Sequence, residues 1–194
     1  KMSKVLVVAA HPDDEILGCG GTLLKHSAKG DQIFVCIVTS AHEPAWSKEY
    51  IERKLEEAEK VDQILGTHKR FFCNLPTVKL NTLPTGEFNS AIKAVIDEVN
   101  PDVIYTHHEH DVNKDHRLVN EAVMVNTRPI NTKIRVCCFE TVSSTEWNHK
   151  PFVPNFYVNI DDHLEEKIEM FCKYESEVKE YPHPRSAEGL RILA

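Results

Sequence analysis

The stretch that decides the fold is VLVVAAHPDDE, residues 5–15. Its first six residues are apolar and largely β-branched, a pattern typical of a buried strand. The strand leads directly into HPDDE, which carries one imidazole and three carboxylates. In α/β proteins the loops that follow the carboxyl ends of strands carry the chemistry, because the sheet holds them rigid. We therefore expect the functional site at this point.

Apolar segments alternate with amphipathic helical segments along the rest of the chain. We expect strands at residues 5–10, 32–39, 70–75, 103–106, 134–140 and 156–160. We expect helices at residues 16–29, 47–65, 87–99, 117–125 and 162–178. Strands that alternate with helices of this length indicate βαβ units. The sequence thus predicts one domain over residues 1–194, with an α/β fold: a Rossmann-like three-layer α/β/α sandwich around a mainly parallel sheet.

Composition excludes several classes of partner. The formal net charge is −7, and no block of Lys and Arg is present, so a nucleic-acid partner is not expected. The apolar runs are far shorter than the roughly 20 residues of a membrane helix, so no membrane insertion is expected. The short amino-terminal run lacks the form of a signal peptide. Six cysteines without CxxC spacing predict reduced thiols and a cytoplasmic location.

A second ionisable cluster follows the predicted strand at residues 103–106. Residues 107–116 read HHEHDVNKDH. In a doubly wound sheet this strand lies beside the first strand at the topological switch point. Both clusters are therefore expected to meet in one crevice.

The two clusters together predict a metal site. Three carboxylates after a histidine repel one another unless a cation neutralises them, and a catalytic site needs three protein ligands and an open position. His11, Asp14 and His116 supply two imidazoles and one carboxylate, which suits Zn²⁺, with Fe²⁺ as the alternative. Asp13 lies close enough to serve as the general base for a metal-activated water. Such a site hydrolyses an acyl or phosphoryl centre.

Several stretches resemble one known family. They are AHPDDE at residues 10–15, RKLEEAEKVDQILG at 53–66, NKDHRLVNEA at 113–122, SSTEW at 143–147 and YPHPRS at 181–186. The chain resembles the LmbE/PIG-L family of zinc-dependent N-acetylglucosaminyl deacetylases. The resemblance implies the same zinc ligands and the same base as the residue argument. It also implies that Arg53 contacts substrate and that the protein self-associates.

The chain departs from the family pattern within the second cluster. Where many members have a histidine that assists the transition state, this chain has Asn113. Either His110 takes that catalytic role, or Asn113 donates a hydrogen bond to the developing oxyanion. Asp115 is expected to orient a neighbouring histidine.

The end of the chain is a second departure. Family members continue beyond the PHPRS-like segment, so the domain is expected to have an incomplete carboxyl-terminal end. In the segment that is present, His183 and Arg185 are candidates to fold over the pocket.

The function expected from these observations is removal of the N-acetyl group from an N-acetylglucosamine-type amino sugar in a small-molecule conjugate. Two alternatives stay open: a metal-dependent hydrolase of another amide or ester, and a non-catalytic sugar- or nucleotide-binding Rossmann-like module. The spacing of Gly18, Gly20 and Gly21 is not the GxGxxG of dinucleotide sites, which weakens the second alternative. These glycines serve either close packing or the approach of a ligand.

Overall fold

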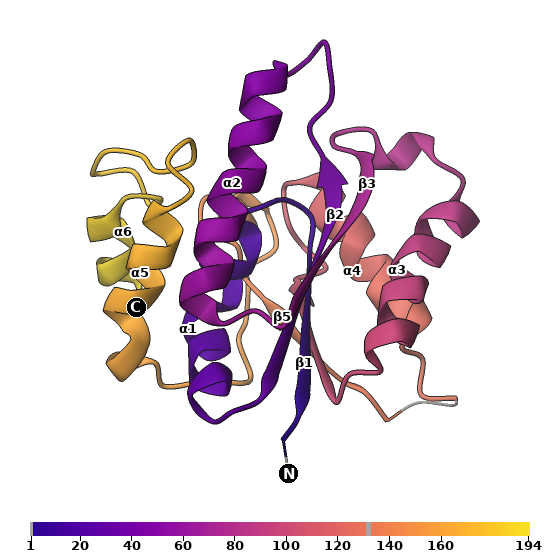
Figure 1. Ribbon diagram of the computed structural model, residues 1–194, viewed down its shortest axis with the longest axis horizontal. Coiled ribbons are helices and arrows are strands. Elements are labelled where there is room, and N and C mark those ends of the chain that lie inside the picture. The colour runs from indigo at the N-terminus through magenta and orange to yellow at the C-terminus, as the bar shows by residue number, and fades with distance from the viewer. Residues whose placement is uncertain (1, 131–132) are drawn as a thin grey trace.

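The computed structural model describes residues 2–130 and 133–194. Its centre is a sheet of five parallel strands in the order β3-β2-β1-β4-β5 (Figure 1). The strands are β1 Lys4–Ala9, β2 Gln32–Ser40, β3 Lys69–Pro76, β4 Val103–His107 and β5 Arg135–Phe139. β1 pairs with β2 on one side and with β4 on the other, so the strand order reverses beside β1. The predicted switch point is confirmed.

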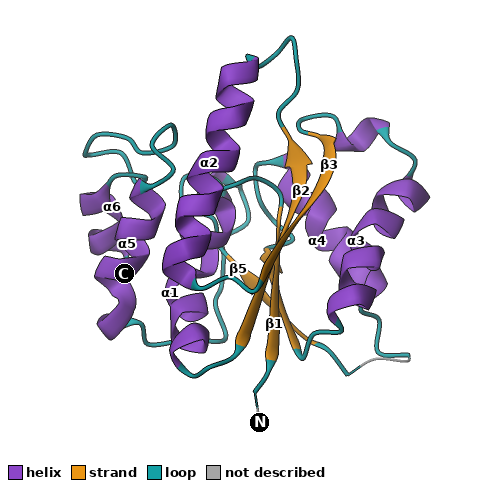
Figure 2. Cartoon of the chain, in the orientation of Figure 1, coloured by secondary structure: helices purple, strands orange, loops and turns teal. Residues whose placement is uncertain are grey.

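Helices cover both faces of the sheet, which confirms the three-layer sandwich (Figure 2). The helices are α1 Asp14–Ala28, α2 Lys48–Leu65, α3 Thr85–Val99, α4 Lys114–Asn126, α5 Leu164–Cys172 and α6 Ala187–Leu193. Short 3₁₀ turns lie at Leu80–Thr82, Thr145–Trp147 and Asp161–His163. In Figure 1 α3 and α4 lie on one side of the sheet and the other four helices on the opposite side.

Alternation along β1 explains the two layers. Val5 and Val7 join the core shared with α1, α2 and α5, whereas Leu6 and Val8 join the core shared with α3 and α4. A strand that is buried on both faces needs an unbroken apolar run, and that is the sequence of β1. Among the described residues, no helix is long and apolar enough to cross a membrane. All six cysteines are free thiols.

Two predicted elements near the carboxyl end are wrong. Residues 156–160 form no strand, and Phe156 and Tyr157 are 60% and 77% exposed. The aromatic and β-branched residues of this segment favour a strand, but that preference is expressed only when a neighbouring strand pairs with it. The predicted helix at 162–178 ends at Cys172, and α6 was not predicted. Residues 173–178 instead form turns whose side chains contact α2 and the start of α1.

The glycines of α1 serve close packing. A Cβ on Gly18 would lie 2.1 Å from the Phe139 ring, and one on Gly21 would lie 2.7 Å from Ile160 Cδ1. Helix α1 therefore approaches the end of β5 and the segment before α5 more closely than any side chain would allow.

We expect Gly18→Ala to lower the free energy of unfolding by about 1–3 kcal/mol, because the added methyl group overpacks a buried contact with Phe139. Urea denaturation measures the change. Gly86→Ala is the matched control, since a Cβ there meets nothing within 4 Å and the position lies in α3. Equal midpoints for Gly18→Ala and the unmodified protein would show that α1 can move away at no cost.

Candidate active site

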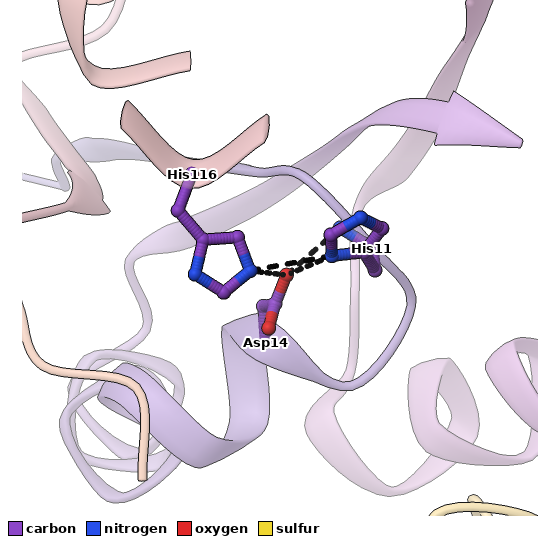
Figure 3. A group of neighbouring side chains, drawn as sticks. All are labelled: His11, Asp14 and His116. Carbon is purple, nitrogen blue, oxygen red and sulfur yellow. Dashed lines mark hydrogen bonds and ion pairs between the residues drawn. The ribbon is translucent and has the colours of Figure 1, made fainter. Parts of the chain in front are cut away.

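Three potential metal-binding side chains meet at the carboxyl edge of the sheet (Figure 3). His11 follows β1, Asp14 is the first residue of α1, and His116 lies in the first turn of α4, which follows β4. Asp14 Oδ2 lies 3.0 Å from His11 Nδ1 and 3.2 Å from His116 Nε2. The two imidazole nitrogens lie 3.3 Å apart. We call these residues the His–Asp–His cluster.

This donor set fits a divalent transition metal. The ligand atoms of all three side chains lie within 4.8 Å of one another, and Asp14 and His116 are almost fully buried. Two imidazoles and one carboxylate that leave open positions match catalytic zinc sites and non-haem iron(II) sites. The cluster could therefore hold either ion.

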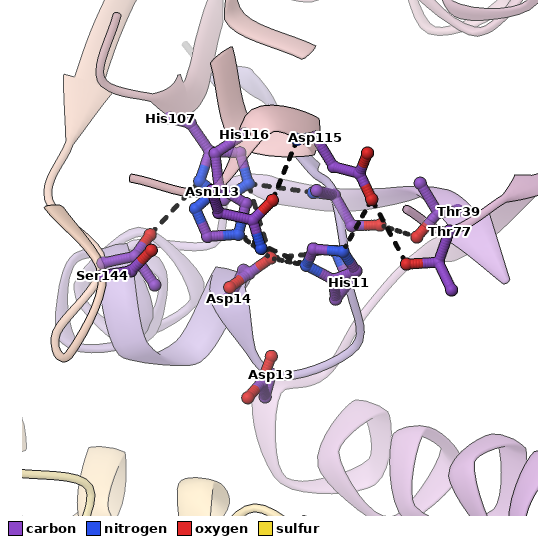
Figure 4. Close-up of polar contacts among 12 residues, drawn as sticks. His11, Asp13, Asp14, Thr39, Thr77, His107, Asn113, Asp115, His116 and Ser144 are labelled. Atoms are coloured by element: carbon purple, nitrogen blue, oxygen red, sulfur yellow. Dashed lines mark hydrogen bonds and ion pairs between the residues drawn. The ribbon is translucent and has the colours of Figure 1, made fainter. Parts of the chain in front are cut away.

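Each histidine of the cluster has a carboxylate behind it, and Figure 4 shows Asp115 beside His11. His11 Nε2 lies 3.3 Å from Asp115 Oδ2, and His116 Nδ1 lies 3.1 Å from Asp111 Oδ2. A carboxylate at the outer nitrogen keeps the proton there, so that the inner nitrogen carries a lone pair for a metal. Asp115 is therefore in contact with a neighbouring histidine, and its orienting role stays a prediction. Asp111 was missed, although it belongs to the same ionisable run after β4.

Asp111 is itself held in place. Its carboxylate accepts hydrogen bonds from the hydroxyls of Ser144 and Thr145 and from the backbone N–H of Asn113. Burial alone would raise the pKa of Asp111, but the neighbouring His116 imidazole and the Ser144 hydroxyl lower this pKa to about 2. Asp111 is consequently a fixed anion behind His116.

We expect Asp111→Asn to weaken metal binding about 10–100-fold, because the amide no longer fixes the proton on His116 Nδ1. Titration of the metal-free protein against a competing chelator measures the affinity. Asp97→Asn, which removes an exposed carboxylate paired with Lys93, should leave the affinity unchanged. An unchanged affinity in Asp111→Asn would remove Asp111 from the metal site.

A third histidine packs against the cluster. His107 is fully buried, and its ring stacks on His116 with centroids 3.9 Å apart. The backbone N–H of Ala10 donates to His107 Nε2 at 2.9 Å. Burial and the nearby His116 hold the pKa of His107 well below its usual range, so this ring is neutral. It fixes the plane of His116 and ties β1 to β4.

Protons compete with a metal at His11. Burial opposes protonation of the imidazole, but Asp115 and Asp14 raise the pKa of His11 to about 10. A metal binds only the deprotonated Nδ1, so binding at neutral pH must release a proton. We expect the apparent dissociation constant to fall about tenfold from pH 6.5 to pH 7.5, measured by calorimetry in buffers of different ionisation enthalpy. A pH-independent constant would contradict this assignment.

Asp13 occupies a separate position beside the cluster. It is 3% exposed, and its Oδ2 accepts a hydrogen bond from Arg185 Nη1 at 3.0 Å. Burial and the Asp14 charge raise the pKa of Asp13 to about 8, against the opposing effect of Arg185. Its φ of 131° is unfavourable for a residue with a side chain, and such strain gathers at functional sites.

A buried ionic network maintains that strained conformation. Glu15 Oε2 accepts a hydrogen bond from the backbone N–H of Asp13 at 3.0 Å. Glu15 Oε1 accepts hydrogen bonds from Tyr174 and from Arg70, and Arg70 also forms two hydrogen bonds with Asp62. The third acid of HPDDE is therefore structural: it holds the backbone that presents Asp13.

The cluster and Asp13 open onto a cavity of about 400 Å³. This volume falls within the range of about 300–1,000 Å³ for small-molecule sites. Besides His11, Asp13, Asp14 and His116, the lining includes Asn113, Arg185 and a wall of apolar residues from the start of α2.

Of the remaining predicted residues, Asn113 lies at the cavity, Arg53 lies near it and His110 lies outside its lining. Asn113 lines the cavity, and its Oδ1 caps α4 by accepting the N–H of Asp115. Arg53 is exposed and lies over the ring of Tyr50, which does line the cavity. His110 is not part of the lining; its Nε2 lies 3.2 Å from Lys150 Nζ.

Sequence reasoning missed Lys54 and Glu177, which form an ion pair of 2.7 Å at the cavity wall. Arg185, a candidate from the tail, does reach the site. No periodicity or spacing marks the ion pair, because its two members lie in segments far apart in the chain.

Fold and site together define the class of protein. It is a doubly wound α/β protein with three potential metal ligands and a buried carboxylate at the switch point of its sheet. The chain belongs to the PIG-L family, whose sequence model, described as GlcNAc-PI de-N-acetylase, matches residues 6–126. The matched range contains the whole His–Asp–His cluster.

Relatives of the chain are named as deacetylases. An uncharacterized deacetylase of Escherichia coli, YaiS, is 29% identical over 91% of this chain and 92% of its own length. The diacetylchitobiose deacetylase of Thermococcus kodakarensis is 27% identical over 92% of this chain and 72% of its own length. The crystal structure of the Pyrococcus horikoshii N,N'-diacetylchitobiose deacetylase has the same fold, with a TM-score of 0.76, 21% identity, and coverage of 99% of this chain and 77% of that one.

Proposed function

We propose that the protein is a metal-dependent deacetylase that removes the N-acetyl group from an N-acetylglucosamine-type amino sugar in a small-molecule conjugate. The observation that carries the proposal is the His–Asp–His cluster with the buried Asp13 carboxylate beside it, at the end of one cavity. Membership in a family whose named relatives are deacetylases supports this choice of bond.

Each of these residues has a separate role in the proposed reaction. A bound Zn²⁺ or Fe²⁺ would act as a Lewis acid and lower the pKa of a water molecule. Asp13 accepts the proton of the attacking water and afterwards donates it to the leaving amine. Arg185 holds the Asp13 carboxylate in position through its hydrogen bond of 3.0 Å.

We assign stabilisation of the oxyanion to Asn113 rather than to His110. Asn113 lines the cavity, and because its Oδ1 already caps α4, its amide N–H₂ is the group that can donate. His110 lies against Lys150 and Glu109 instead. Arg53 approaches the cavity through Tyr50, so we propose that it contacts substrate only at the rim.

Metal analysis and amine release together test the proposal. The purified protein is stripped with a chelator, reloaded with Zn²⁺ or Fe²⁺, and incubated with a panel of N-acetylglucosamine conjugates. We expect primary amine to appear only with metal. Bound metal without amine release would favour the hydrolysis of another amide or ester, and failure to bind metal would favour the non-catalytic binding module. Self-association and a cytoplasmic location stay predictions.

A further inference from the structure

One wall of the active-site cavity is apolar. Helix α2 begins beyond the carboxyl ends of the strands, and its first turns rise above them (Figure 1). This end of α2 and the preceding loop contribute Trp46, Tyr50, Ile51 and Leu55 to the lining, and β3 adds Phe72. We call these five residues the α2 wall.

The fold does not use much of this apolar surface. Trp46, Tyr50 and Leu55 belong to neither hydrophobic core of the described chain, and Leu55 is 45% exposed. Apolar side chains that line a cavity and contribute little to the core keep contact area available for a ligand.

The charged side chains that line the cavity beside the α2 wall are already paired. Lys54 Nζ lies 2.7 Å from Glu177 Oε1, and Tyr50 donates a hydrogen bond to the same oxygen at 3.3 Å. Arg185 is engaged with Asp13 and lies 3.7 Å from Glu177. An anionic group entering here would have to break an ion pair, whereas an uncharged apolar group would not.

A chain of contacts connects Asp13 to this wall. Asp13 contacts Arg185, Arg185 contacts Glu177, and Glu177 contacts Tyr50. In the proposed reaction Asp13 returns a proton to the leaving amine, so the amine lies on the Asp13 side of the acetyl carbonyl. The sugar that carries the amine extends from the same side. The α2 wall therefore lies beyond the sugar rather than beyond the acetyl methyl group.

We propose that the α2 wall binds an uncharged apolar aglycone, an alkyl or aryl group attached to the amino sugar, and so sets the preference of the enzyme among N-acetylglucosamine conjugates. This inference rests on the proposed deacetylase function. Trp46 contributes an indole ring to the lining, and Leu55 and Ile51 contribute aliphatic side chains.

A series of glycosides tests the inference. The methyl, hexyl and phenyl β-glycosides of N-acetylglucosamine share the scissile amide and differ only in the aglycone. We expect kcat/KM of the metal-loaded enzyme to be about tenfold higher for the hexyl and phenyl glycosides than for the methyl glycoside, from the apolar area that they bury. Trp46→Ala and Leu55→Ala should each remove most of that advantage and leave the methyl glycoside within about twofold. Met124→Ala is the matched control, since Met124 is 44% exposed on α4 and lies outside the cavity lining.

Two further arms keep the outcomes distinct. Lengthening the acyl group from acetyl to butyryl on the methyl glycoside should give no gain; a gain abolished by Trp46→Ala would assign the wall to the acyl chain and overturn the inference. Equal kcat/KM for all three aglycones would also overturn it, while amine release from all of them would leave the deacetylase proposal intact.

If no glycoside releases amine, the deacetylase proposal fails. Calorimetry of the hexyl and methyl glycosides then still decides the inference. Equal affinities overturn it, and a tenfold preference for the hexyl glycoside supports it.

Discussion

Asp13→Asn is expected to lower kcat about 10²–10⁴-fold while the protein keeps its full metal content. Asparagine has the shape of aspartate and tolerates a positive φ, so the backbone held by Glu15 should survive the change. The amide cannot accept the proton of the attacking water. A loss of turnover without a loss of metal distinguishes the general base from the metal ligands. Substitution of a metal ligand should lower both turnover and affinity for the metal.

The measurement is amine release under saturating substrate, together with metal content by elemental analysis. A second readout is the pH profile of kcat/KM. Burial and the Asp14 charge raise the pKa of Asp13, and the titration of Asp13 should disappear from the acidic limb of this profile in the variant. Asp97→Asn serves as the surface control. Wild-type turnover in Asp13→Asn would remove Asp13 from the role of base.

His116→Ala should abolish activity and weaken metal binding by more than about 100-fold, since substitution of residues behind metal ligands already costs 10–100-fold. The local structure should persist, because Asp111 keeps its hydrogen bonds from Ser144, Thr145 and the backbone of Asn113. Activity and affinity therefore fall together here, in contrast to Asp13→Asn.

His108→Ala is the matched control for this variant. His108 lies in the same run after β4, but its ring contacts Phe152 and His110 rather than the cluster. Thermal unfolding by circular dichroism verifies that both variants are folded. Normal metal binding by folded His116→Ala would mean that the third ligand comes from elsewhere.

The parts of the structure that sequence reasoning predicted depend on local pattern and on a general rule of topology. The apolar run of β1 and the ionisable residues after it are adjacent in sequence. Placing His116 beside His11 required only that β1 and β4 be neighbours at the switch point, which parallel sheets of this type favour.

The parts that were not predicted depend on the return of the chain after β5. The pairing of Glu177 with Lys54 and of Arg185 with Asp13 is set by how residues 173–186 fold back over α2, and no periodicity encodes that path. The predicted strand at 156–160 is wrong for a related reason. Its residues favour a strand, but the path of the chain brings no neighbouring strand to pair with it. Asp111 could have been found by asking which carboxylate orients His116.

The contact between Arg185 and Asp13 spans 172 residues of sequence, and that between Tyr174 and Glu15 spans 159. The three proposed metal ligands and the hydroxyls that hold Asp111, in contrast, are all present once residue 145 has been made. During synthesis the two long-range contacts can form only after Tyr174 and Arg185 themselves have been made. The proposed metal site should therefore be able to assemble before Tyr174 and Arg185 are present to position Asp13, the proposed base, and full activity should require the docked tail.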